Sequence, residues 1–546
     1  MKKLKQEINT ILQNKTFIFL LILVALGCYG FKMMHPTIGV DDTPYKLYFE
    51  DGLNIVVGRW VLFLLNQFIS IGQYAPFLTD FAAVLLLMLA AILWCVVFKR
   101  ILGSNLPDWC YLTFSCLFIS NPIISEVFTY FLHNGIAIGY TCSALALLFY
   151  LDGLDTPKKI TPYVLSTVFI WIAIGCYESF AVVFLVMALF ALLMKRICGE
   201  KPHPILSILK IGIILIVAIL LRSLINNVLI LIFSLQELVN QADKRSLGEM
   251  FGWISNPEGF ANLKMAIKRT LVMYGVFAYH YLPITLYVFS SIIVFIGSIW
   301  KTIRRKDPWI FLYMIGIFIA SWLLVFIEGS VTLYRSCQFL PLFVAAAFLL
   351  LMYLCRKLLQ KPIRYVAILL VAVLLWNQTA DMNKWFYINY RKYENIKETL
   401  LDVALELESH HDISKPVIFV GSYEIPMGIV QDAYVPLGTE TFYKMNRITQ
   451  IIDPHLLEKY YRRNNIWVVQ TPALSLIGWG INAFGGNQEL IHFYNMHGHN
   501  FVGVNDYDTI SKAQTDYFNI PCWPKEGSIV ETDEYIIVSF GNAEYQ

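Results

Sequence analysis

About eleven long stretches of mostly apolar residues constrain this chain more than any other feature of its sequence. A helical span needs about 20 such residues to cross roughly 30 Å of hydrocarbon. The pattern therefore predicts a polytopic α-helical membrane protein with about eleven transmembrane helices. The stretches are residues 16–34, 79–98, 109–126, 134–151, 163–177, 180–195, 206–232, 281–300, 308–328, 338–355 and 364–380.

One pair of these stretches leaves an alternative open. Residues 163–177 and 180–195 are either two spans or one long tilted helix, and the sequence Gly175 to Ser179 interrupts them. Counting them as two gives an odd number of spans, which places the two termini on opposite sides of the membrane.

The composition agrees with a lipid environment. The chain is 57% hydrophobic and only 15% charged, whereas soluble domains are about 45–50% apolar and about 25% charged. This excludes an ordinary cytosolic enzyme, a disordered protein and a small disulfide scaffold. A net charge of +3 gives no indication of nucleic-acid binding. Most of the ten cysteines lie in apolar sequence, so neither a disulfide framework nor a paired set of metal ligands is indicated.

Lysine and arginine residues in the short loops predict the orientation, because cytoplasmic loops carry an excess of both. Lys2, Lys3, Lys5 and Lys15 precede the first span and place the N-terminus in the cytoplasm. No small-residue cleavage site follows this span, so it is not a removable signal peptide. The other dense basic clusters then also fall on the inner side, at 99–100, 158–159, 195–196, 301–306 and 356–364.

The composition changes after residue 380, which predicts two domains. Residues 1–380 hold 18 acidic and 30 basic residues, whereas residues 381–546 hold 21 and 12. By the parity of the spans, this acidic tail is an extracytoplasmic domain. Its pattern predicts an α/β fold, with a helix at 382–409, a buried strand at 416–421, a helix at 508–518 and a hairpin at 528–540.

The first outward loop, residues 35–78, carries the adjacent carboxylates Asp41 and Asp42 just above the end of a span. One of them suits a general base for an acceptor hydroxyl, tuned by the charge of its neighbour. Together they suit a divalent cation instead. The third interpretation is a solvated acidic turn before Pro44. Further along the loop, the aromatic-rich segment 45–70 predicts a helix lying along the membrane interface.

Carboxylates recur at the outer boundary of four other spans. Ionisable groups at membrane depth are costly and usually face a cavity or a partner. Interfacial solvation explains any single one, but four at one level favour a shared cavity. They are Asp80, Glu126, Glu178 and Glu328.

Cations at this outer level are fewer, and they are candidates for binding an anion. Arg222 interrupts the seventh apolar stretch, and its guanidinium suits a phosphate because it donates two parallel hydrogen bonds. The alternative for Arg222 is an internal ion pair, and for Arg59 it is snorkelling to the interface. Arg269 and Arg335 complete the set.

Some familiar signatures are missing or weak. The chain has no Gly-x-x-x-x-Gly-Lys-Ser/Thr loop, so ATP hydrolysis is not expected. Asp506-Tyr507-Asp508 spells a short metal-binding pattern of nucleotide-sugar enzymes, but its place in the tail favours a turn and a helix cap.

Several short motifs resemble those of the Gtr type II glucosyltransferases, which are multi-span enzymes of the GT-C superfamily. His35-Pro36 leading to Asp41-Asp42, and then Gly58-Arg59-Trp60, resembles the first outward loop of that family. Tyr177-Glu178-Ser179 is similar to its Tyr-Gln-Ser/Ala turn, with Glu in place of Gln. The remaining similar motifs, in the same order, are Tyr334-Arg335 before Leu340-Pro341, residues 415–421, and residues 520–527.

The resemblance implies an enzyme that takes a sugar, glucose in that family's chemistry, from a polyprenyl-phosphate donor on the outer side of the membrane. It implies Asp41 or Asp42 as the base and the arginines Arg59, Arg222 and Arg335 as ligands of the donor phosphate. The acceptor is then a cell-surface glycan such as an O-antigen or a teichoic acid, and no resident cofactor is expected. The competing classes are a flippase of lipid-linked sugars and a surface-glycan polymerase or ligase.

Overall fold

The computed structural model describes most of the chain but not all of it. It covers residues 2–37, 53–65, 76–128, 133–200, 202–236, 252–271, 285–329, 336–359, 362–421, 487–504, 506–517 and 519–540.

The described chain is mostly helical, and each predicted apolar stretch contains a helix. Seven helices are long and apolar enough to cross a membrane: α2 (Lys15–Met34), α5 (Pro76–Leu102), α8 (His133–Asp155), α10 (Phe180–Cys198), α11 (Pro204–Ile232), α15 (Thr285–Arg305) and α19 (Ile363–His410). Four apolar helices are shorter: α6 (Asp108–Ile119), α9 (Thr161–Cys176), α16 (Pro308–Ser321) and α18 (Phe339–Leu354). The fold class is thus confirmed as multi-helical, while eleven crossings stay a prediction.

Local sequence sets the helix boundaries. The stretch 163–195 is two helices, α9 and α10, because the chain leaves helical geometry between Tyr177 and Ser179. Gly199 ends α10 in the left-handed conformation that glycine adopts without strain (φ 107°). At the start of α16, the carboxylate of Asp307 accepts a hydrogen bond from the Trp309 amide (3.2 Å), and Pro308 occupies the first helical position.

The basic clusters meet at one end of the bundle, where ion pairs join the ends of helices that are not consecutive in the sequence. Arg100 at the end of α5 contacts Glu7 of α1 (Lys2–Leu12) at 2.7 Å and Asp152 of α8 at 2.8 Å. Arg196 at the end of α10 pairs with Asp307 at 2.9 Å. The helices therefore alternate in direction as the predicted topology requires, and the side that faces the cytoplasm remains a prediction.

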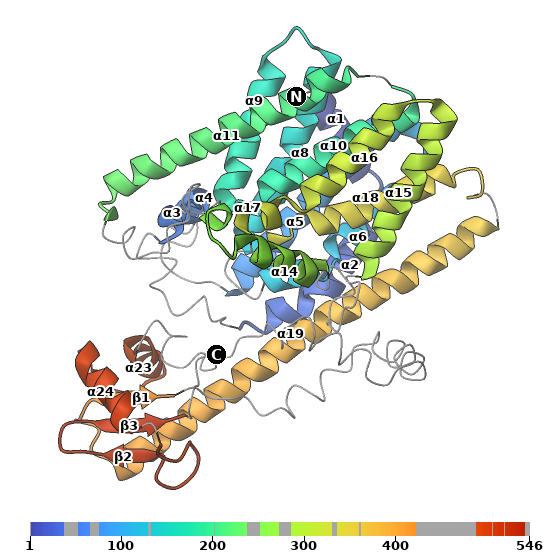
Figure 1. The fold of residues 1–546 in the computed structure, drawn as a ribbon. Coiled ribbons are helices and arrows are strands. Elements are labelled where there is room, and N and C mark those ends of the chain that lie inside the picture. Colours follow the sequence, from blue (N-terminus) through green and yellow to red (C-terminus); the bar gives the residue numbers. More distant parts are fainter. Residues whose placement is uncertain are drawn as a thin grey trace, which may run out of the picture.

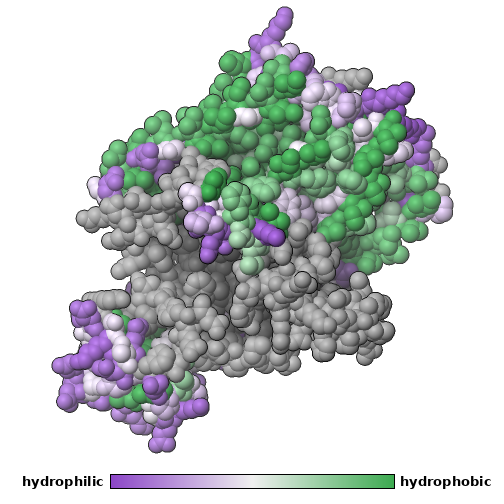
Figure 2. Space-filling view, viewed as in Figure 1, coloured by the Kyte–Doolittle hydropathy of each residue, from purple (hydrophilic) through white to green (hydrophobic). Residues whose placement is uncertain are grey.

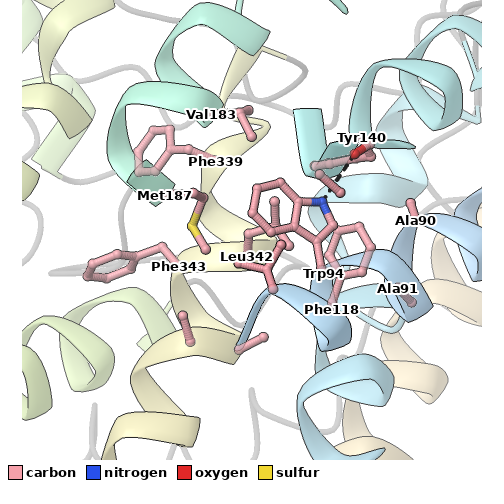
Figure 3. Close-up of a cluster of buried hydrophobic side chains, with 14 of the residues drawn as sticks. Ala90, Ala91, Trp94, Phe118, Tyr140, Val183, Met187, Phe339, Leu342 and Phe343 are labelled. Atoms are coloured by element: carbon pink, nitrogen blue, oxygen red, sulfur yellow. Dashed lines mark hydrogen bonds between the residues drawn. The ribbon is translucent and has the colours of Figure 1, made fainter. Parts of the chain in front are cut away.

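Large aromatic side chains fill the centre of the bundle (Figure 3). Trp94 of α5 is fully buried, and its indole N–H donates to the carbonyl of Tyr140 on α8 (3.2 Å). The Tyr140 hydroxyl in turn donates to the carbonyl of Gln338 (2.7 Å), just before α18. Because these polar atoms are satisfied, the rings cross-link three helices without leaving a buried donor unpaired.

Outside this core, the bundle presents apolar side chains to its surroundings. Figure 2 shows hydrophobic residues over much of the bundle and hydrophilic residues over the small C-terminal sheet and its helices. Helix α11 is the clearest case, with Leu209, Ile213 and Leu220 each more than half exposed. Such a surface is stable only against lipid, because a large exposed apolar area is unfavourable in water.

Helix α19 connects the bundle to the C-terminal sheet and runs past the predicted boundary at residue 380 (Figure 1). The last predicted span and the tail helix predicted at 382–409 are therefore one 48-residue helix. It packs along α2, where the Asn383 amide donates to the Gly27 carbonyl (2.6 Å). At the C-terminal end of α2, the ring of His35 lies between those of Phe31 (4.2 Å) and Tyr390 (4.9 Å).

The C-terminal unit has the predicted α/β character. Strand β3 (Ile536–Ser539) lies centrally, parallel to β1 (Val417–Val420) and antiparallel to β2 (Ile529–Glu531). The end of α19 and α23 (Asn487–Met496) cover one face of the sheet, and α24 (Tyr507–Asp516) covers the other. Asp506 caps α24 by accepting from the Thr509 amide (2.9 Å), which confirms a helix cap in the Asp506-Tyr507-Asp508 motif.

The buried pair of Arg196 and Asp307 tests whether the ion pairs between helix ends stabilise the fold. The two side chains are 6% and 10% exposed, so Asp307→Asn leaves a buried guanidinium without its counter-charge. We expect a loss of about 3 kcal/mol in stability, measured by thermal unfolding in detergent. Asp108→Asn is the matched control, because the pair of Lys99 and Asp108 is 34% and 58% exposed and should contribute less than about 1 kcal/mol. Equal effects of the two substitutions would contradict this assignment.

Candidate active site

Two short helices, α3 (Leu53–Val56) and α4 (Trp60–Leu65), lie between the ends of α9 and α11, opposite the basic end of the bundle. Trp60 packs on Trp171 of α9 with ring centroids 4.8 Å apart. Ile55 and Phe63 pack with Ile230 of α11. The single interfacial helix predicted over 45–70 is therefore wrong in its described part, since the chain turns at Gly58.

Arg222 of α11 holds this turn in place. Its Nε donates to the Gly58 carbonyl (3.0 Å) and its Nη2 to the Val57 carbonyl (3.1 Å). Gly58 has a φ of +82°, and a Cβ there would collide with the Arg222 guanidinium. The partners of Arg222 within the described chain are thus carbonyl oxygens, where the sequence suggested an anion or an internal ion pair.

Arg59 follows the turn and meets Glu178. Its Nη2 lies 3.2 Å from Oε1 of Glu178 and its Nε lies 3.4 Å from Oε2, so one edge of the guanidinium faces both carboxylate oxygens. The guanidinium carbon lies 4.4 Å from the centroid of the Tyr177 ring, within range of a cation–π interaction. Two of the predicted outer residues are therefore in direct contact, although they are 119 positions apart in the sequence.

The electrostatics of this group keep Glu178 ionised. Burial alone would raise the pKa of Glu178, but the charge and hydrogen bonds of Arg59 lower it, and the charge of Arg222 lowers it further, to about 2. Among the described residues, two guanidinium groups thus act on one carboxylate. Such a cluster favours an additional anion more than an additional cation. Arg59, Tyr177, Glu178 and Arg222 form a group that we call the Arg59 cluster.

The other predicted site residues are placed only in part. Asp41, Asp42 and Arg335 lie outside the described residues, as do the side chains of Glu126 and Arg269. Glu328 ends α17 (Leu323–Glu328) and is partly exposed. Asp80 lies near the start of α5 and is fully buried. A cavity shared by all the outer carboxylates stays a prediction.

No resolved group of three or more His, Cys, Asp or Glu side chains converges within the described ranges to form a metal site. Asp41 and Asp42 lie outside these ranges, so the alternative that they hold a divalent cation is still a prediction.

Lys32 is an outer cation that the sequence analysis did not single out. It lies in the last turn of α2 and is only 3% exposed. Its Nζ donates to the Thr37 hydroxyl oxygen (3.0 Å), which draws the start of the first outward loop back over the helix end. A lysine three residues before His35-Pro36, inside an apolar stretch, was the available signal.

Comparison with protein families identifies the chain. A profile of the family described as Glucosyl transferase GtrII matches residues 30–354, which is more than half of the chain. The chain belongs to this family. It is therefore a glycosyltransferase, as the motifs of the sequence indicated. No curated protein and no solved structure gives a significant match.

The family match covers the helical bundle of this glucosyltransferase up to residue 354 and leaves out the C-terminal part. All the predicted site residues and the whole Arg59 cluster fall within residues 30–354. Residues 355–546, about a third of the chain, lie beyond it and contain α19 and the C-terminal sheet. The resemblance of residues 415–421 and 520–527 to the family therefore stays a prediction.

Gly58 tests whether the turn positions Arg59 for catalysis. Gly58→Ala places a Cβ against the Arg222 guanidinium and strains a backbone at positive φ. We expect at least a tenfold loss of glucosyl transfer in membranes, at unchanged protein level. Gly30→Ala is the matched control, because a Cβ at Gly30 has no atom within 4 Å. Full activity of Gly58→Ala would show that the geometry of this turn is unimportant.

Proposed function

We propose that this enzyme transfers glucose from a polyprenyl-phosphate donor to a cell-surface glycan on the outer side of the membrane. The acceptor is an O-antigen, a teichoic acid or another surface polymer. The N-terminus then faces the cytoplasm and the C-terminal α/β domain is extracytoplasmic. This goes beyond family membership, which assigns glucosyl transfer without naming the donor lipid, the acceptor or the side.

The Arg59 cluster is the observation that carries the proposal. When the sugar is transferred, its bond to the phosphate oxygen breaks and polyprenyl phosphate is the leaving group. The negative charge that grows on this phosphate needs fixed cations nearby. The guanidinium of Arg59 has a planar edge of N–H groups that suits a phosphate. Arg222 holds the turn before Arg59 and adds a second positive charge close to it. Arg222 lies among lipid-exposed residues of α11 such as Leu220 and Leu224, which places the cluster at a depth that a prenyl chain in the bilayer can reach.

The acceptor hydroxyl needs a base, and Asp41 or Asp42 fills this role in the proposal. Both belong to the loop that begins at His35, six or seven residues before them. Arg335 is proposed as a further phosphate ligand, and Glu126 and Glu328 as carboxylates that favour the positive charge of the sugar in the transition state. No metal is assigned a step.

The two competing classes differ from this proposal in observable ways. A flippase of lipid-linked sugars would move the donor without cleaving it, and membership of a glucosyltransferase family argues against it. A polymerase or ligase would transfer whole glycan repeats, and would therefore release no polyprenyl monophosphate from a single-sugar donor.

A turnover assay tests the donor and the base together. Purified enzyme is mixed with polyprenyl-phosphate glucose and a surface-glycan fraction, and released polyprenyl phosphate is measured. We expect turnover with this donor and none with UDP-glucose. We also expect the double variant Asp41→Asn/Asp42→Asn to lose at least 100-fold in kcat, as for removal of a general base. An unchanged rate in this variant would exclude both aspartates as the base.

The same assay tests the cation. Arg59→Ala removes a positive charge next to the proposed phosphate, so we expect kcat/KM to fall by about 100-fold. Arg59→Lys keeps the charge but loses the planar donor edge and should recover only part of the activity. Equal activity of the two variants would contradict a bidentate role for this arginine.

Cysteine labelling tests the orientation. Cys522 is partly exposed in the C-terminal domain, whereas Cys198 and Cys355 are partly exposed at the basic end of the bundle. A membrane-impermeant maleimide added to sealed right-side-out cells should label Cys522 and spare the other two. Labelling of Cys198 and Cys355 without Cys522 would reverse the proposed topology. Cys522→Ser provides the background control.

A further inference from the structure

The edge of Arg59 that best suits a phosphate is also the edge that Glu178 contacts. A guanidinium binds carboxylate and phosphate through the same pair of parallel N–H groups. In this structure Nε and Nη2 of Arg59 point to the two oxygens of Glu178. A phosphate that binds this edge side-on must therefore take the place of the Glu178 carboxylate.

The contact is loose enough for exchange. Its two N···O distances are 3.4 and 3.2 Å, whereas charge-assisted hydrogen bonds are usually about 2.7–2.9 Å long. The arginine pairs at the basic end of the bundle are tighter, with Arg100 at 2.7 Å from Glu7 and Arg196 at 2.9 Å from Asp307. Glu178 also keeps 24% of its side chain exposed, so its side chain is not enclosed on every side.

Arg59 does not depend on Glu178 for its position. The Tyr177 ring supports the guanidinium from one side (4.4 Å), and the Tyr177 hydroxyl lies 3.3 Å from Ser336 Oγ. The backbone of Arg59 is fixed by its N–H, which donates to the Asn54 carbonyl (2.6 Å), and by the Arg222 hydrogen bonds to the turn before it. Neutralising Glu178 should therefore leave Arg59 in place.

We propose that Glu178 is an internal competitor for the donor phosphate: the carboxylate and the phosphate take the Nε–Nη2 edge of Arg59 in turn. This rests on the proposed polyprenyl-phosphate donor. The donor is a phosphodiester with one negative charge, whereas the released polyprenyl phosphate is a monoester with up to two. The product therefore binds Arg59 more strongly than the donor does, and the return of Glu178 to the guanidinium promotes its release.

Glu178→Gln is the test, because it removes the charge and keeps the shape. We expect the Kd for polyprenyl phosphate, measured by binding to purified enzyme in detergent, to fall by roughly fivefold. This is the effect of removing one unit charge about 4 Å away in water-like surroundings. The KM for polyprenyl-phosphate glucose should also fall, while kcat falls or stays unchanged. A carboxylate that only maintains the fold would raise both constants when it is neutralised.

Two further variants serve as controls. Glu258→Gln removes an exposed charge just before α14 (Gly259–Leu271), and it should change neither constant. Glu178→Asp keeps the charge on a shorter side chain and should remain closer to wild type than Glu178→Gln. Thermal unfolding verifies that each variant is folded. An unfolded Glu178→Gln would itself overturn the proposal, because a displaceable carboxylate is not required for the fold.

The outcomes separate this inference from the proposed function. Wild-type turnover combined with an unchanged or higher Kd in Glu178→Gln overturns the competition and leaves the proposed function standing. Tighter binding of polyprenyl phosphate by Glu178→Gln, without turnover of polyprenyl-phosphate glucose by wild type, supports the competition and overturns the donor assignment. No binding of polyprenyl phosphate by either protein overturns both.

Discussion

The rest of the Arg59 cluster depends on the hydrogen bonds from Arg222 to the turn between α3 and α4. A guanidinium at the depth of a lipid-exposed helix is costly unless its N–H groups have partners. Two of those groups are satisfied by the carbonyls of Val57 and Gly58, which a chain exposes only where it leaves helical geometry. One arginine therefore fixes the backbone just before Arg59.

Arginines at the opposite end of the bundle also need partners for their buried N–H groups, but there the partners are carboxylates. There, Arg100 and Arg196 are matched by carboxylates at short distances, and the pairs join the ends of helices that are distant in sequence. These contacts contribute to the fold. At the end with the Arg59 cluster, two guanidinium groups act on one described carboxylate, and the distances from Arg59 to Glu178 are longer.

The family match does not cover residues 355–546, which are about a third of the chain. The matched range ends at residue 354, the last residue of α18. Helix α19 nevertheless packs on α2 close to His35, the residue that opens the first outward loop. One uninterrupted helix therefore carries the contact with His35 and continues to the C-terminal sheet (Figure 1).

Much of this protein follows from the sequence alone. Apolar stretches of about 20 residues predict helices in lipid, since hydrophobicity and length are local properties. Local sequence also predicts three shorter features: the interruption at Tyr177-Glu178-Ser179, the strand at 416–421 and the cap at Asp506. The sequence also placed Arg59, Arg222 and Glu178 on a short list, because charges are rare among apolar residues.

Only the tertiary structure decided which of these charges are partners. Arg59 and Glu178 are 119 positions apart, and no local pattern relates them. Within the described chain, the hydrogen-bond partners of Arg222 are backbone carbonyls, which every residue carries and which a sequence cannot single out. The continuity of α19 across residue 380 was likewise hidden by a change in composition, because a helix that leaves the bilayer changes its solvent without changing its hydrogen bonds.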